Sequence, residues 1–452
     1  MPDFSVIPSI EQLRQRPAIR ALEARFGAEA TVDAVRAAAA EVRRSIAGGA
    51  SGEVVGRIEV AAAAQLADAF RPSLTTVINA TGVVIHTNLG RAPLAAPAID
   101  RIAEVARGYA SLEYDLARGT RGRRDVHAEA LLCRLTGAEA AVVVNNNAAA
   151  TMIVLAALAV GREVIVSRGE LVEIGGGFRV PDVMAQSGAV LREVGTTNKT
   201  RAADYAAAIS ERTALILRVH PSNFTIEGFT ERPTLEDLVA VGRTFNIPVA
   251  EDLGSGLLKK GDDSFLEPSV DATVAAGVDV CCFSVDKLLG GLQAGIIVGR
   301  AAQVDRIRKH PLMRALRVDK MTYAALEATL AEYAAGRAQT TVPVQRMLAM
   351  TADEIRARVD RVASAIRGHD GWRADVLRGM SAIGGGSAPG VELPTWLIAI
   401  EKSGVTPDAL EALLRRGSPP VIVRIERDRV LLDLRTVLPE QDSALTASWA
   451  DL

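Results

Sequence analysis

The sequence predicts an α/β fold, in which a mostly parallel sheet covered by helices lies between a helical segment and a small α+β domain. Three observations support this prediction. Apolar residues recur at three- and four-residue spacings over residues 1–72, which is the period of helices. Short apolar runs alternate with helical stretches over 73–330, and the order of elements changes again over 331–452. We therefore expect three domains with these boundaries.

The first predicted domain is all-helical. Its helices are expected at 8–26, 31–47 and 53–70, where Ala, Arg and Glu are frequent. Pro17 and the glycine-rich stretch 48–52 interrupt the pattern. We expect these helices to pack together as a separate helical domain.

Seven apolar runs predict the strands of the second domain. Most of the runs are continuous rather than alternating and are rich in β-branched residues, which is typical of strands covered on both faces. The strands are expected at 141–144, 163–167, 190–193, 214–219, 249–251, 280–284 and 294–298. Strands of this kind indicate a mostly parallel sheet between two layers of helices.

A different order of elements predicts the third domain. The elements expected towards the C-terminus are a helical stretch at 322–367, strands at 372–377 and 393–401, a helix at 407–416, and strands at 420–426 and 429–435. The last two strands flank Arg427 and Asp428 and are predicted to form a hairpin. The Gly-Gly-Gly-Ser stretch at 384–387 is interpreted as a turn.

Composition and charge argue against several classes of protein. The formal net charge is −2 and the isoelectric point about 6.3, so the chain lacks the basic excess typical of nucleic-acid binders. Its three cysteines, Cys133, Cys281 and Cys282, show neither disulfide nor zinc-ligand spacing, so we expect no metal site and a reducing, cytoplasmic location. The first residues do not resemble a signal peptide, and no apolar run of about 18 residues predicts a membrane span.

The strongest chemical signal is a lysine that closely follows an apolar strand. Residues 281–291 read Cys-Cys-Phe-Ser-Val-Asp-Lys-Leu-Leu-Gly-Gly, which places Lys287 between the strand and two glycines. Partial burial lowers the pKa of an amine and makes it a nucleophile for an aldehyde. Ser284 in the same turn is a candidate donor to a phosphate group. A surface lysine in a strand–loop–strand connection is the alternative, and this segment alone does not decide between them.

A carboxylate at the end of another apolar strand favours the catalytic interpretation. Asp252 ends the run Val249-Ala250-Glu251-Asp252, one β–α–β unit before Lys287. In that position a carboxylate can pair with the ring nitrogen of a pyridoxal cofactor and make the ring an electron acceptor. The alternative is an aspartate that caps a helix, which is the commoner role for a single residue.

A third signal lies where the first predicted strand of the sheet runs into small polar residues. Asn146, Asn147 and Ala148 would open a helix, and the free N–H groups of a helix N-terminus bind phosphate. The motif alone is weakly specific. In chain order, however, a phosphate loop, an aspartate and a lysine resemble the aspartate-aminotransferase-like (fold type I) class of pyridoxal-phosphate enzymes.

Longer motifs resemble one family of that class, the bacterial selenocysteine synthases or L-seryl-tRNA(Sec) selenium transferases. The first motif, at 78–94, reads Ile-Asn-Ala-Thr-Gly-Val-Val-Ile-His-Thr-Asn-Leu-Gly-Arg-Ala-Pro-Leu. The other similar motifs lie at 167–176, 193–200, 220–224, 284–295 and 310–320. The regions before and after these motifs are similar to the family in length and character only.

The resemblance implies a pyridoxal-phosphate-dependent transferase fold whose N-terminal helical domain contacts tRNA. It implies that Lys287 binds pyridoxal 5'-phosphate covalently, that Asp252 pairs with the ring nitrogen, and that Asp286 acts beside the lysine. The implied reaction converts seryl-tRNA(Sec) to selenocysteinyl-tRNA(Sec) by eliminating the serine hydroxyl and adding selenium from selenophosphate. A large homo-oligomer built from dimers is implied as well.

The resemblance also implies the residues that bind substrate. Selenophosphate is an oxyanion, and arginine binds oxyanions through two parallel hydrogen bonds. The substrate-binding candidates inside the motifs are Arg91, Arg314, Arg317, Thr196, Thr197 and Asn223. Arg314 and Arg317 stand three residues apart and would share a face if helical. Ordinary solvated surface charges are the alternative interpretation of the arginines.

Two other functions remain open at this point. A pyridoxal-phosphate lyase that removes ammonia from a small phosphorylated amino acid or amino-sugar acid would use the same lysine and a similar anion site. A non-catalytic RNA-binding or scaffold protein could keep the fold. The helical extension favours the tRNA substrate over the lyase reaction, and the intact pair of Asp252 and Lys287 argues against a scaffold.

Overall fold

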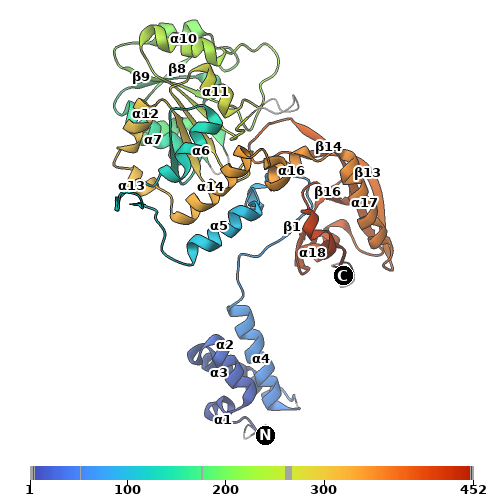
Figure 1. Cartoon of the computed structure of the whole chain (residues 1–452). Coiled ribbons are helices and arrows are strands. Elements are labelled where there is room, and N and C mark those ends of the chain that lie inside the picture. The colour runs from blue at the N-terminus through green and yellow to red at the C-terminus, as the bar shows by residue number, and fades with distance from the viewer. Residues whose placement is uncertain are drawn as a thin grey trace. The chain divides into compact units, whose positions relative to one another are not determined.

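The structure is a computed structural model that describes residue 4 and residues 6–50, 52–174, 177–259, 267–447 and 449. Gly175 and Gly176, which belong to one of the motifs, lie outside the described residues. The chain divides into two compact units, Met1–Thr76 and Val77–Leu452 (Figure 1). Across the described residues, no helix is both long and apolar enough to span a bilayer.

The first unit is a bundle of four helices. These are α1 (Ile10–Arg14), α2 (Pro17–Phe26), α3 (Ala28–Ala47) and α4 (Val54–Ala69). The helix expected at 8–26 is therefore two helices, because Pro17 begins a new one at its first position, where its missing N–H costs nothing. Leu13, Ile19, Val35 and Ile58 are buried together in one apolar cluster.

A seven-stranded sheet forms the centre of the second unit, and it confirms the predicted α/β fold. Its strands, in spatial order, are β4 (Ala140–Val144), β12 (Gly295–Gly299), β11 (Val280–Ser284), β10 (Val249–Gly254), β9 (Thr213–Val219), β5 (Glu163–Ser167) and β8 (Val190–Val194). All neighbouring strands are parallel except β12, which is antiparallel to both β4 and β11. Each predicted strand is present, with bounds shifted by at most a few residues.

Helices cover both faces of this sheet. One face packs against α6 (Val126–Thr136), α10 (Leu235–Phe245), α11 (Val270–Ala276) and α14 (Lys320–Ala334), and the other against α7 (Asn147–Ala159), α8 (Val180–Ser187) and α12 (Ala301–Arg308). Successive residues of a strand point to opposite faces. Val143 accordingly belongs to the first apolar cluster and Val142 to the second. This two-sided burial explains the continuous apolar runs in the sequence.

The stretch expected to be helical at 322–367 is helical, but it is divided among four helices. They are α14, α15 (Ala338–Thr341), α16 (Pro343–Ala349) and α17 (Ala352–Arg367). Gly336 adopts a left-handed conformation after α14, Pro343 starts α16, and the Thr351 side chain caps α17. Left-handed glycine ends helices, while proline and threonine start them.

The C-terminal region contains a four-stranded antiparallel sheet backed by α17 and α18 (Pro407–Arg416). Its strands, in spatial order, are β13 (Trp372–Ala382), β14 (Glu392–Lys402), β17 (Arg429–Asp433) and β16 (Arg424–Glu426). The predicted hairpin is confirmed: Arg427 and Asp428, with φ of 51° and 57°, form the left-handed turn between β16 and β17. The boundary of this domain at residue 331 stays a prediction.

Shorter elements complete the second unit. They are β1 (Ile78–Asn79), α5 (Ala96–Ala106), β2 (Tyr114–Asp115), β3 (Thr120–Arg121), β6 (Glu173–Ile174), β7 (Phe178–Arg179), α9 (Ala202–Ala208), α13 (Met313–Leu316), β15 (Val421–Ile422) and α19 (Asp442–Ala447). β1 pairs in parallel with β15, and Ile85 N–H donates to the Ile383 carbonyl at 2.8 Å. The bond between Ile85 and Ile383 brings the loop after β13 beside the segment that precedes the seven-stranded sheet.

Candidate active site

Lys287 lies in the loop after β11, at the sheet edge where the parallel strands β9, β10 and β11 end. The side chain is only 6% exposed, and Nζ donates to the Gly386 carbonyl at 3.4 Å. Burial lowers the pKa of the Lys287 amine and the nearby charge of Arg91 lowers it further, while three carboxylates oppose the shift. The lowered pKa makes the neutral, nucleophilic form of the amine more accessible near neutral pH.

Asp252, near the end of β10, is a buried carboxylate held by two donors. Asn147 Nδ2 donates to Oδ1 at 2.7 Å, and Thr151 Oγ1 donates to Oδ2 at 3.1 Å. Burial raises the pKa of Asp252, and the two hydrogen bonds counteract the rise. Within the described part of the chain no cation forms an ion pair with this carboxylate. A buried carboxylate of this kind is stabilised by a cationic partner.

The start of α7 lies beside Asp252, because Asn147 and Thr151 belong to its first turns. Asn146 is the N-cap residue, and its Oδ1 accepts the Ala149 N–H at 2.8 Å. The side chains of Asn146 and Asn147 are thus used in capping and in holding Asp252. The backbone N–H groups at the start of the helix, including that of Ala148, have no partner within the helix. They form an anion-binding end.

Two strand-end residues flank the loop that carries the lysine. Ser284, the last residue of β11, is buried and pairs across to Gly295 of β12. A Cβ atom at Gly295 would lie 2.2 Å from the Asn146 carbonyl oxygen, so only glycine lets β12 pass this close to α7. The sequence therefore places the Lys287 loop and the start of α7 at one sheet edge.

Asp286 forms an ion pair with Arg91, with Arg91 Nη1 2.7 Å from Asp286 Oδ2. Arg91 belongs to the first motif, where it follows the short helix Thr87–Leu89, and it has a left-handed backbone with φ of 64°. Its N–H donates to the His86 carbonyl at 3.0 Å, which closes the loop. The arginine side chain remains 35% exposed, so one end of this pair is accessible from solvent beside the lysine.

Arg314 and Arg317 line a cavity of about 460 Å³. The condition for a shared helical face is not met, because α13 ends at Leu316 and Arg317 is extended with ψ of 145°. Arg314 is exposed, and Arg317 Nη1 lies 3.5 Å from Glu113 Oε1. Arg124 and Arg308 line the same cavity, whose described lining does not include Lys287.

The remaining substrate-binding candidates lie on exposed loops beyond β8 and β9. Thr197 lines a cavity of about 320 Å³ together with His220 and Glu267, whereas the Thr196 hydroxyl donates to the Lys199 carbonyl at 3.0 Å. Asn223 Nδ2 donates to the Glu173 carbonyl at 2.9 Å. The Asn223 side chain also lies beside the loop that carries Gly386.

The glycine loop at 384–387 was interpreted as a simple turn, but it reaches the site. The Gly386 carbonyl is the acceptor for the Lys287 amine, and Glu267 accepts the Ala388 N–H. Three consecutive glycines are a signal that the backbone needs left-handed conformations or a close approach. Nothing in the sequence pattern indicates that Glu267 would meet this loop.

These residues fit pyridoxal 5'-phosphate. A buried amine suits its aldehyde, a buried carboxylate without a cation suits its protonated ring nitrogen, and a helix N-terminus suits its phosphate. Buried polar atoms that lack a partner in the described protein, among them His86 Nδ1 and Asn147 Oδ1, also occur around the site. Among the described residues, no three His, Cys, Asp or Glu side chains cluster in a way that could hold a metal ion.

Comparison with known proteins identifies the family. Residues 77–438 match the family described as L-seryl-tRNA selenium transferase, and residues 4–43 match the N-terminal family of selenocysteine synthase. The chain is 49% identical to L-seryl-tRNA(Sec) selenium transferase of Geobacter sulfurreducens over 99% of both chains. It is 45% identical to the Aquifex aeolicus protein of the same name over 93% of both chains.

A solved structure supports the fold. The structure of D-glucosaminate-6-phosphate ammonia-lyase is similar with a TM-score of 0.59 and 24% identity, over 84% of this chain and 95% of that one. The family match over residues 77–438 includes Lys287, Asp252, Arg91 and the arginines that line the cavity of Arg314 and Arg317. The chain therefore belongs to the L-seryl-tRNA selenium transferase family.

Proposed function

We propose that this chain converts L-seryl-tRNA(Sec) to selenocysteinyl-tRNA(Sec), using pyridoxal 5'-phosphate and selenophosphate. The observation that carries the proposal is the buried pair of Lys287 and Asp252 at one sheet edge, inside a region that matches the family. The name of the Geobacter sulfurreducens relative, which aligns with nearly the whole chain, supplies the substrate.

The side chains around Lys287 divide the first half of the reaction between them. When bound, pyridoxal phosphate supplies an aldehyde that captures amines and a ring that accepts electrons. Lys287, whose pKa is lowered by burial, takes up the α-proton of the seryl group once its amine is free. Asp252 keeps the ring nitrogen protonated, and Asn147 and Thr151 hold its carboxylate in place.

The arginines serve the second half of the reaction in this proposal. Adding selenium at the β-carbon requires a site for the phosphate oxygens of selenophosphate. Arg91 forms an ion pair with Asp286, the residue before Lys287. Arg314 and Arg317 line a cavity together with two further arginines. Guanidinium groups bind such oxyanions with paired hydrogen bonds. Thr196, Thr197 and Asn223 are proposed to contact the seryl-tRNA end from the neighbouring loops.

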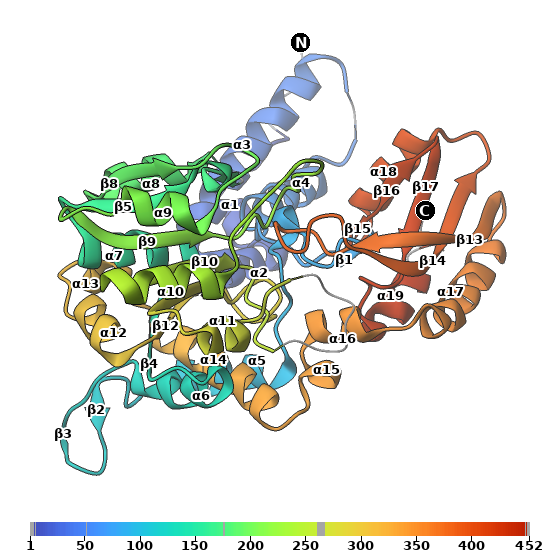
Figure 2. The same cartoon turned by 90° about the horizontal axis from the view of Figure 1, so that it is seen from above.

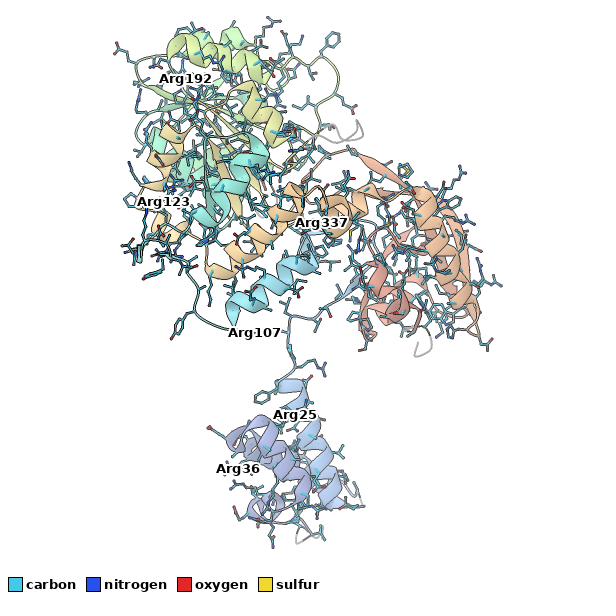
Figure 3. The ribbon with its side chains drawn as sticks, viewed as in Figure 1. Arg25, Arg36, Arg107, Arg123, Arg192 and Arg337 are labelled. Atoms are coloured by element: carbon cyan, nitrogen blue, oxygen red, sulfur yellow. The ribbon has the colours of Figure 1, made fainter. Side chains whose placement is uncertain are left out.

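The N-terminal helical unit is proposed to bind tRNA. All nine of its basic residues are arginines, but nine acidic residues over 1–76 cancel their charge. Arg25 and Arg36 project from its helices (Figure 3). Several acids are paired within the unit, as in the Arg14–Glu23 ion pair, where the Nε–Oε1 distance is 2.7 Å. Individual exposed arginines such as Arg25 and Arg36, rather than net charge, would therefore contact the phosphates.

We further propose a cytoplasmic homo-oligomer built from dimers. The hairpin of β2 and β3 projects from the body of its unit (Figure 2). It and the loop before it expose Tyr109, Tyr114 and Leu116, which are 109%, 52% and 78% accessible. Clustered apolar side chains on a projecting hairpin favour contact with another subunit.

The experiment that tests this function combines the purified protein with seryl-tRNA(Sec), selenophosphate and pyridoxal phosphate. We expect selenocysteinyl-tRNA(Sec), detected by mass spectrometry of the released amino acid. The alternative is a lyase acting on a small phosphorylated amino-sugar acid, the class of substrate named for the similar solved structure. Release of ammonia from such a compound, without any selenium transfer, would contradict the proposal.

A further inference from the structure

The loop after β13 has an unusual backbone. Gly384, Gly385, Gly386 and Ala388 all have positive φ, of 76°, 63°, 67° and 46°. For a residue with a Cβ, such as the buried Ala388, a left-handed conformation is unfavourable. A conformation of this kind persists only where surrounding contacts hold it.

Close packing explains the first two glycines. A Cβ at Gly384 would lie 2.4 Å from Val83 Cγ1, and one at Gly385 would lie 2.3 Å from Ile85 Cγ2. The Ile85 N–H also donates to the Ile383 carbonyl. One side of the loop is therefore fixed against the segment that begins the second unit.

The third glycine faces the reacting amine. The Gly386 carbonyl accepts from Lys287 Nζ at 3.4 Å, and a Cβ at Gly386 would lie 3.9 Å from Nζ. The same Cβ would lie 3.8 Å from Asn223 Cβ and 4.0 Å from Ser222 Oγ. These are ordinary contact distances, so the positive φ of 67° rather than a lack of space favours glycine here, and the backbone carbonyl is an acceptor for the amine.

Glu267 holds the other end of the loop. Its side chain is buried, Oε1 accepts the Ala388 N–H, and Oε2 lies 3.1 Å from His220 Nε2. The backbone N–H of His220 in turn donates to the backbone carbonyl of Asp252 at 2.9 Å. The Glu267 carboxylate therefore contacts the loop directly and is linked through His220 to the strand end that carries Asp252.

Glu267 is also an electrostatic neighbour of the lysine. Burial raises the pKa of Glu267, but hydrogen bonds and the charge of His220 outweigh burial, so its pKa lies below the usual value. The ionised carboxylate in turn raises the pKa of the Lys287 amine. Its loss would act on that amine in two ways, through the lost charge and through the displaced Gly386 carbonyl.

We propose that Glu267 is a positioning residue, whose buried carboxylate locks the glycine loop so that the Gly386 carbonyl stays against the Lys287 amine. The proposal rests on the proposed role of Lys287 as the reacting amine. It assigns a function to three segments distant in sequence, namely the stretch after β9, Glu267 and the loop after β13.

Two measurements on full-length protein test this role without relying on turnover. Hydrogen exchange of the peptide that covers residues 383–392 reports whether the loop is held. The pH dependence of Lys287 modification by acetic anhydride, after removal of the cofactor, reports the pKa of the amine. In Glu267→Ala we expect loop exchange to rise about tenfold to a hundredfold, as for a lost charge-assisted hydrogen bond. We also expect Lys287 to titrate at lower pH.

Two conservative variants distinguish the effect of the length of the Glu267 side chain from the effect of its negative charge. Glu267→Gln keeps an oxygen that can accept the Ala388 N–H, so loop exchange should stay near the parent value while Lys287 still titrates at lower pH. Glu267→Asp keeps the charge but shortens the side chain, so loop exchange should rise as in Glu267→Ala. Glu267→Asp also answers the question if Glu267→Ala does not fold.

Glu163→Gln is the matched control. Glu163 is an equally buried carboxylate, but it lies at the start of β5 and contacts Ser210 and Arg212 instead of the loop. We expect it to leave both readouts unchanged. The proposal is overturned if Glu267→Ala or Glu267→Asp leaves loop exchange and Lys287 titration at the parent values. Because neither readout needs selenium transfer, failure of the proposed function would show separately, as a parent protein without product.

Discussion

The Lys287 site and the arginine cavity differ in how deeply their side chains are buried and in which residues they contact. Lys287 and Asp252 are 6% and 4% exposed, and their polar atoms contact Gly386, Asn147 and Thr151. The cavity around Arg314 and Arg317 is open at the surface, and Arg317 is paired with Glu113 rather than with the lysine loop.

The difference shows which steps need a preformed environment. Proton transfer and electron withdrawal depend on shifted pKa values, which require burial and fixed neighbours. Binding an oxyanion from solution requires accessible guanidinium groups instead. We therefore expect substitutions in the buried site to affect every step, and substitutions in the arginine cavity to affect selenium addition alone.

The largest change in reaction rate is expected for Asp252→Asn, in the buried site. Asparagine keeps the shape and can still accept from Asn147, but it removes the negative charge that we propose pairs with the ring nitrogen of the cofactor. Since the carboxylate is almost fully buried, we expect the rate of selenocysteinyl-tRNA formation to fall about a hundredfold. Single-turnover kinetics with saturating cofactor measure the effect. A variant with parent-like rates would show that Asp252 is only structural.

A smaller and more selective effect is expected for Arg314→Ala and Arg317→Ala. These side chains are solvent-accessible, so each should lower the rate of selenium addition about tenfold at low selenophosphate. Binding of seryl-tRNA and loss of the serine hydroxyl should be unchanged. Product yield is measured against selenophosphate concentration, with Arg→Lys as the conservative variant. Equal yields for parent and both alanine variants would move the anion site to Arg91 or the arginines at 118–124.

The same contrast explains how far the sequence could predict the structure. The seven strands of the sheet were predictable because most are continuous apolar runs, and Lys287 and Asp252 were predictable because they lie at or just after the ends of two such runs. The contact between Glu267 and Ala388 joins residues 121 positions apart, so no local pattern reveals it. Arg314 and Arg317 would share a face only if both were helical, but α13 ends at Leu316 and leaves Arg317 outside. Local signals locate strand ends, whereas loops that meet across domains need the fold.

A subtler effect is expected in the pH dependence of stability. Because burial lowers the pKa of Lys287, the unfolded chain binds more protons than the native chain between the lowered pKa and the ordinary value of about 10.4. The free energy of unfolding of the cofactor-free protein should therefore gain a contribution from Lys287 as pH rises through that window. Lys287→Met should lack this contribution, while Arg314→Met, at an exposed position, should keep it. Parallel curves for parent and Lys287→Met would contradict a lowered pKa.

The central claim is that Lys287 is the amine that holds the cofactor. Borohydride reduction of the purified protein with pyridoxal phosphate, followed by peptide mass spectrometry, tests it directly. We expect the reduced adduct on the peptide that contains Lys287 and its absence in Lys287→Ala. An adduct on another lysine, such as Lys199 or Lys259, with Lys287 unmodified, would contradict the account.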